Sequence, residues 1–164
     1  MKTYSFVRTA VTLMGMVAAS AVIAVPTASA DNDKENIQVS ASVLRNCIVS
    51  STAAIAFGDY DVNSATDNSK QGRVTVACTK GVTATIGLGS GLNGNRTMNG
   101  PTTDKLAYLL AKDTNGADWS DSSTVSYNST TRTAKDFTVY GKIRAGQDMT
   151  AGSYTDTVVA TINF

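Results

Sequence analysis

The apolar residues of this chain recur with a period of two, the spacing of a β-strand, and almost nowhere with the period of a helix. From Asp31 onward, short alternating segments are separated by turns rich in Gly, Asn, Asp and Ser. We predict strands at Gly72 to Thr79, Val82 to Leu88, Leu106 to Ala111, Asp136 to Ile143 and Tyr154 to Phe164. Many short strands joined by turns predict an all-β antiparallel sandwich.

The first thirty residues have the pattern of a secretory signal peptide. Lys2 and Arg8 precede an apolar run from Ala10 to Val25, and the small residues Ala28 to Ala30 follow it. The apolar run is shorter than the roughly 20 residues that span a bilayer, so we expect no stable membrane insertion. We expect cleavage before Asp31 and export of the whole mature chain.

The mature chain is expected to form one domain with nearly balanced charge. About 134 residues suffice for one hydrophobic core and are too few for two. The formal charge of +1 falls to about −1 when the two basic residues of the signal peptide are removed. This balance does not favour binding of nucleic acid or of an anionic membrane.

Cys47 and Cys78 are the only two cysteines. In an oxidising compartment, such a pair within one domain is expected to form a disulfide, the alternative being two free buried thiols. Closure of a loop of about 32 residues would stabilise the fold by roughly 3 to 4 kcal/mol. A metal site at this pair would need further ligands, and the chain contains no histidine.

Two alternating segments carry the main functional hypothesis. The first precedes Cys47 and the second ends the sequence, where we expect no strand to follow. In the first, the apolar face consists of Ile37, Val39, Ala41 and Val43. In the second, one face consists of Val158, Ala160, Ile162 and Phe164. A terminal strand without a successor would leave an open sheet edge, which the first segment could fill. Alternatively, the first segment is simply the first strand of its own domain.

The sequence offers no catalytic site, and its other candidate sites are weak. The absence of histidine excludes Ser-His-Asp and Cys-His arrangements. Asp59 and Asp61 resemble the start of a calcium loop, but Ser64 and Lys70 replace the residues that such a loop requires. These carboxylates are better explained as turn residues. We therefore predict no enzyme activity, metal or cofactor.

Two further features could serve in binding: the segment from Gly89 to Asp104 and the single tryptophan. We expect the segment to be a solvated loop, although loops also carry binding function. Trp119 would suit a sugar-binding surface by stacking, but we expect it to be a core or rim residue that caps the sandwich.

Several stretches, taken together in their order along the chain, resemble the spore coat protein U domain family. This family includes the major subunits of archaic chaperone-usher pili. The stretches are Val39 to Val49, Ile55 to Asp61, Gly72 to Lys80, Leu106 to Trp119, Thr138 to Gln147 and Ala151 to Phe164. They extend through almost the whole mature chain. The combination of FGDYD, VACTK, TVYGKI and a terminal GSYTDTV is specific, although each piece alone is weak.

The resemblance implies an incomplete immunoglobulin-like sandwich that lacks its final strand. A periplasmic chaperone would hold the subunit first, and at an outer-membrane usher the N-terminal strand of the next subunit would complete it. By this likeness, residues 31–45 are the donor segment and 46–164 the sandwich. Cys47 and Cys78 occupy the positions of the family's disulfide. Ile37, Val39, Ala41 and Val43 would then be donor residues, and the strand ending at Phe164 would border the acceptor groove.

We accordingly predict a structural subunit of a surface pilus that polymerises with identical or related pilins. Adhesion and biofilm formation follow as implications of the resemblance. Two other functions remain open. One is a monomeric secreted carbohydrate-binding module that uses Trp119 and the Gly89 to Asp104 loop. The other is a structural protein of a spore or cell coat.

Overall fold

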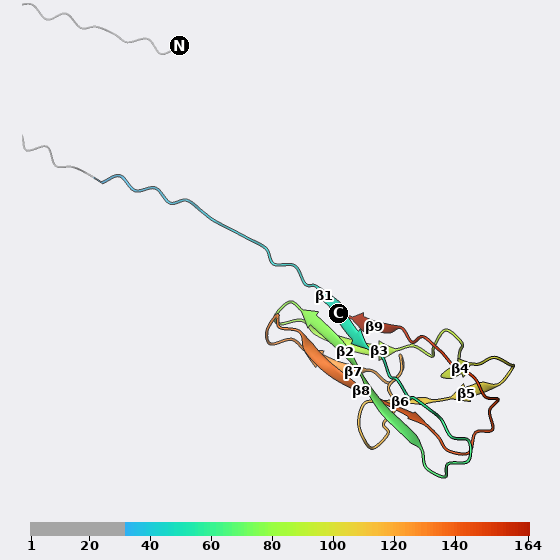
Figure 1. Cartoon of the computed structure of the whole chain (residues 1–164). Coiled ribbons are helices and arrows are strands. Elements are labelled where there is room, and N and C mark those ends of the chain that lie inside the picture. Colours follow the sequence, from blue (N-terminus) through green and yellow to red (C-terminus); the bar gives the residue numbers. More distant parts are fainter. Residues whose placement is uncertain (1–31) are drawn as a thin grey trace, which may run out of the picture. The chain divides into compact units, whose positions relative to one another are not determined.

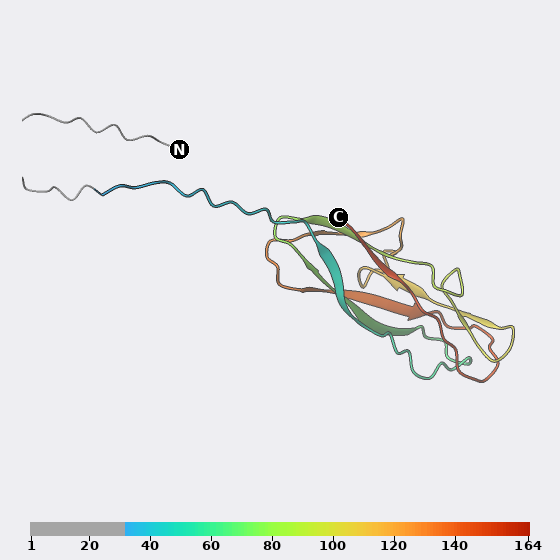
Figure 2. The same ribbon diagram turned by 90° about the horizontal axis from the view of Figure 1, so that it is seen from above.

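The computed structural model describes residues 32–164, so the predicted signal peptide lies outside the described residues. The chain divides into two units, Met1–Ser40 and Ala41–Phe164. Residues 32–40 of the first unit form no strand. In the second unit the strands follow its long direction (Figure 1), as they also do when it is seen from above (Figure 2). The described residues form strands and turns and contain no helix, which confirms the predicted all-β class.

The larger sheet has the strand order β1-β2-β8-β6 and is antiparallel throughout. Its strands are β1 (Cys47–Ala53), β2 (Asn68–Cys78), β8 (Lys135–Ile143) and β6 (Leu109–Ala111). Along β2 and β8, alternate residues are buried, as expected of strands with one face on a core. β1 and β6 are the two edges of this sheet.

The second sheet has the order β7-β3-β9, and a third, two-stranded sheet pairs β4 with β5. Their bounds are β7 (Val125–Asn128), β3 (Thr83–Leu88), β9 (Ala160–Asn163), β4 (Thr97–Asn99) and β5 (Lys105–Ala107). The predicted strand from Leu106 to Ala111 is therefore two strands in two sheets. The change occurs at Tyr108, whose backbone N–H is bonded to Arg96 (N···O 2.9 Å) rather than to β8.

The prediction of a solvated loop from Gly89 to Asp104 is wrong in part. This segment contains β4 and lies along the C-terminal segment of the chain. The N–H of Gly89 donates to the carbonyl of Val159 and the N–H of Leu92 to that of Thr157, each at 2.9 Å. A turn in which Asn95 and Arg96 have positive φ interrupts this pairing. The segment is too irregular and too polar to show the apolar alternation of a strand in the sequence.

The core lies between the two larger sheets and is formed mainly by Val, Leu, Ile and aromatic side chains. After β1, the chain crosses the inner face of the larger sheet at two glycines. A Cβ atom at Gly72 would lie 2.5 Å from Cγ1 of Ile55, and one at Gly141 would lie 2.9 Å from the ring of Phe57. Glycine at these two positions leaves the space in which Ile55 and Phe57 pack.

Candidate strand-binding site

The C-terminal segment has one paired edge and one open edge. The paired edge uses odd-numbered residues. Thr155 exchanges two 3.0 Å hydrogen bonds with Asn99. The carbonyls of Thr157 and Val159 accept hydrogen bonds from the segment 89–92. β9 then continues this pairing along β3. Because backbone groups alternate in direction along a strand, those of the even-numbered residues from 154 to 162 point to the other edge. No strand among residues 32–164 pairs with that edge.

The open edge of β9 lies opposite the open edge of β1. The two strands contact each other although they belong to different sheets. They run in opposite directions, with the C-terminus beside the start of β1 (Figure 1), and the second view agrees (Figure 2). Each sheet of the sandwich therefore contributes one unpaired edge to the same side of the molecule.

A cavity of about 300 Å³ separates the end of β1 from the residues that lead into β9. One wall is formed by residues 52–55 and Phe57, and the other by residues 156–158 and Ala160. Its floor is the core itself: Val74 and Val139 come from the larger sheet, and Leu88 from β3. The hydrophobic core thus opens onto this side through an apolar groove.

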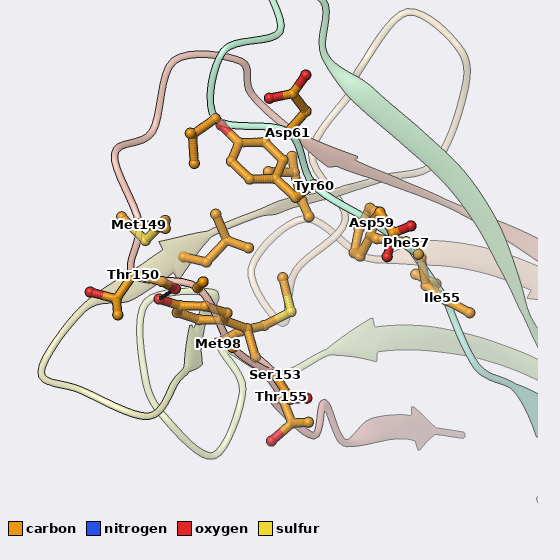
Figure 3. A pocket seen from close by; sticks show the side chains of 18 residues that line it. Ile55, Phe57, Asp59, Tyr60, Asp61, Met98, Met149, Thr150, Ser153 and Thr155 are labelled. Atoms are coloured by element: carbon orange, nitrogen blue, oxygen red, sulfur yellow. Dashed lines mark hydrogen bonds between the residues drawn. The ribbon is translucent and has the colours of Figure 1, made fainter.

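A larger hollow of about 740 Å³ adjoins this cavity at the Tyr154 end. Ile55, Phe57 and Met98 line both spaces, so the groove continues from one to the other. Figure 3 shows Met98 between the Ile55–Phe57 side and Met149. Below, the term "groove" means these two adjoining spaces and the open edge from 154 to 162.

A carboxylate and a phenol are fixed in the wall of the groove. The hydroxyl of Tyr108 donates to Oδ2 of Asp156 at 2.6 Å, and Oδ1 accepts from the backbone N–H groups of Asn93 and Thr157 at 3.1 and 2.8 Å. Burial alone would raise the pKa of Asp156, but these hydrogen bonds outweigh it and lower the pKa below its ordinary value. Burial, and then Asp156, raise the pKa of Tyr108. The pair ties the C-terminal segment to the body of the domain.

The predicted terminal-strand residues are partly in the groove. Val158 and Ala160 line its smaller cavity, and Ile162 packs against the core. Phe164 lies beyond β9 and is half exposed, at 50%. The regular strand is shorter than the predicted Tyr154 to Phe164, because residues 154–159 pair with irregular backbone.

The predicted donor residues are exposed. Ile37 and Val39 in the first unit have exposed fractions of 88% and 89%. Ala41 and Val43 belong to the second unit and are also exposed. Apolar side chains exposed together along one segment are typical of a surface that interacts with a partner.

The opposite wall of the groove could not be predicted from the sequence. Ile55 and Phe57 alternate around Ala56, which is a strand-like signal, but they follow a β1 that is too polar to be recognised as a strand. Met98 was missed because it lies in the segment that was predicted to be a loop. Nothing local in the sequence places any of these residues beside Val158.

The predicted disulfide between Cys47 and Cys78 is present. The two residues are direct partners in the β1–β2 ladder, and both side chains are buried. The bond therefore attaches the first residue of β1, one border of the groove, to the last residue of β2.

The remaining candidate residues have structural roles in the described part of the chain. Trp119 is 1% exposed and its Nε1–H donates to the carbonyl of Ile86 at 2.9 Å, so its ring presents no face to a sugar. Asp61 accepts from the N–H of Asn63 at 2.9 Å within a turn. Among residues 32–164, no group of three His, Cys, Asp or Glu side chains is placed to hold a metal ion. Nor does this region contain a helix long and apolar enough to cross a membrane.

Comparison with known proteins agrees with the resemblance seen in the sequence. The sequence pattern of the spore coat protein U domain matches residues 33–161. The chain belongs to the spore coat protein U domain family. A relative, Protein U of Myxococcus xanthus, is 33% identical in an alignment of 174 positions that covers 90% of this chain and 93% of that protein.

A solved structure supports the fold of this spore coat protein U domain. It is the crystal structure of the CsuC-CsuE chaperone-tip adhesion subunit pre-assembly complex from archaic chaperone-usher Csu pili of Acinetobacter baumannii. The match has a TM-score of 0.52 and 23% identity, and it covers 75% of this chain. This chain spans only 41% of the matched chain. At this identity the likeness shows the fold, and the predicted family and sandwich fold are both confirmed.

Proposed function

We propose that this protein is a structural subunit of a surface pilus, in which residues 37–43 of one copy fill the groove of the next. The observation that carries the proposal is the open apolar groove between β1 and β9. An unpaired edge beside an exposed core is an aggregation hazard that native proteins cover. A β-strand supplied by another molecule satisfies both the backbone groups and the apolar walls.

The N-terminal segment has the pattern and length that this groove requires. Its four apolar side chains occupy alternate positions, so all of them would face the groove while Gln38, Ser40 and Ser42 face solvent. At about 3.3 Å per residue, residues 37–43 cover most of the open edge from 154 to 162. No charged residue interrupts the segment from Ile37 to Leu44.

Burial of the apolar face and formation of ladder hydrogen bonds would both favour assembly. Burial of Ile37, Val39 and Val43 contributes roughly 1.5 to 3 kcal/mol each, and Ala41 adds less. Each ladder hydrogen bond adds about 0.5 to 1.5 kcal/mol, from which the cost of ordering the segment must be subtracted. Donor and acceptor surfaces differ, so the contact is heterologous and adds copies head to tail into a fibre.

Before assembly, the groove needs a temporary occupant. A periplasmic chaperone is the natural one, and the matched crystal structure is of a complex that contains a chaperone. Delivery to an outer-membrane usher would then place the fibre on the cell surface, where adhesion and biofilm formation follow. The signal-like sequence of the first thirty residues is consistent with this export route.

A subunit of a spore or cell coat is the second candidate, favoured by the description of the family that the chain matches. It would use the same groove, so assays of strand donation do not separate the two functions. Isolation of the assembled material does: a pilin is recovered in sheared surface fibres, and a coat subunit in the coat fraction.

The first experiment compares the chain that begins at Asp31 with one that begins at Leu44, both produced in a periplasm. We expect the longer chain to polymerise. We expect the shorter chain to be unstable alone and to become a stable monomer when a peptide spanning Glu35 to Val43 is added. Stability is measured by thermal unfolding and assembly by size-exclusion chromatography.

Two peptide variants provide the matched control. Ile37→Asp in the peptide should weaken binding at least tenfold, because it would place a charge in an apolar groove. Gln38→Asp changes the neighbouring residue on the solvent face and should have little effect. If both variants bind like the original peptide, or if the longer chain is a stable monomer with a protease-resistant N-terminal segment, the proposal is wrong.

A further inference from the structure

The connection between the donor segment and β1 is short enough to allow self-insertion. Only residues 44–46 separate Val43 from Cys47, where β1 begins. The open edge of β9 lies beside β1, and the smaller cavity of the groove begins at Thr52 and Ala53, the end of β1. A reversal within residues 44–46 would therefore direct the donor segment back along β1 toward its own groove. Connections of two to five residues are sufficient for a β-hairpin. A chain built for donation between copies therefore needs something that opposes this reversal.

Thr79 holds this connection against the opposite side of β1. Its backbone N–H donates to the carbonyl of Asn46 at 2.8 Å, and its Oγ1–H donates to the carbonyl of Leu44 at 3.1 Å. Both carbonyls thus point toward the end of β2 and away from the groove. The adjacent disulfide attaches Cys47 to Cys78 and so holds the start of β1 against the end of β2.

From this geometry we propose that Thr79 directs the N-terminal segment outward, so that it is donated to another copy instead of inserted into its own groove. The inference rests on the proposed strand donation. A reversal at residues 44–46 would break both hydrogen bonds made by Thr79. Inserted in this way, the segment would also run antiparallel to β1 and hence parallel to β9, an orientation in which pairing is slightly weaker. Thr79 is a positioning residue in this scheme, because it need not contact the donated strand.

Thr79→Val tests the side-chain contribution, since valine keeps the shape and the backbone N–H but lacks the hydroxyl. The matched control is Thr83→Val, in which an exposed threonine of β3 has no side-chain hydrogen bond among the described residues. Each chain, starting at Asp31, is unfolded and refolded at the same concentration. The readout is the fraction of monomer whose N-terminal segment resists proteolysis.

Loss of one exposed hydrogen bond is expected to raise the ratio of self-inserted monomer to polymer roughly twofold to tenfold. Thr83→Val should behave like the wild type. A further chain, with a flexible Gly-Ser insertion after Asn46, removes the constraint without changing Thr79 and should give still more protected monomer. Peptide binding by Thr79→Val chains truncated to Leu44 should be unchanged, which shows that the groove itself is intact.

The failures of the two proposals are distinguishable. If the wild type polymerises but Thr79→Val gives no more protected monomer than Thr83→Val, Thr79 does not control insertion and strand donation stands. If the insertion variant also polymerises fully, self-insertion is not a competing state and the inference is likewise overturned. If the wild type does not polymerise and the truncated chain does not bind the peptide, strand donation itself is wrong.

Discussion

The two sides of the sandwich end in different ways. On the β6 side, Trp119 closes the core: its backbone N–H donates to the carbonyl of Leu110 in the larger sheet, and its Nε1–H donates to Ile86 in the second sheet. On the β1 side, Val158 and Ile55 face a cavity. The same core is thus closed by its own residues at one edge and open at the other.

The largest expected effect tests the closed side. Trp119→Ala should lower the free energy of unfolding by about 3 to 5 kcal/mol, because a fully buried indole and its hydrogen bond are lost. Urea unfolding of the chain with bound Glu35 to Val43 peptide measures the change. Trp119→Phe keeps most of the apolar volume and should cost clearly less. Similar losses for both variants would mean that the hydrogen bond, and not packing, closes this side.

The next prediction tests the open side with two adjacent valines. Val158 faces the groove, whereas Val159 is 55% exposed and alternates to the other face. Val158→Ala should weaken peptide binding to the Leu44 truncation by roughly fivefold to tenfold. The reason is that the two methyl groups removed would be fully buried only when the peptide fills the groove. Val159→Ala should change binding less than twofold. Equal effects of the two substitutions would show that the donated strand does not contact this wall.

The sequence alone predicts the regular strands and the disulfide better than it predicts the groove. Alternation correctly located β2, β3 and β8, and the two cysteines predicted the disulfide. The groove depends on Ile55 and Val158, which lie about a hundred residues apart and meet only through the sheet topology. The pairing of residues 89–99 escaped prediction because it uses backbone groups of small polar residues, which leave no periodic signal.

The smallest expected effect concerns the attachment of the open edge to the domain, and it depends on pH. The pKa of Asp156 is lower in the folded chain than its ordinary value of 3.8, so the unfolded chain binds a proton more readily. The stabilisation is therefore fully present above about pH 4 and is lost as the pH falls through the lower folded-state pKa.

Asp156→Asn should reduce the midpoint of thermal unfolding at pH 7 and should flatten its decline between pH 5 and 2.5. Asp148→Asn, at an exposed carboxylate with no hydrogen bond among residues 32–164, serves as the control. Since Asp156 anchors one wall of the groove, peptide binding by the wild type should weaken over the same acidic range. An acid profile that is unaltered by Asp156→Asn would show that the contact with Tyr108 does not hold the open edge in place.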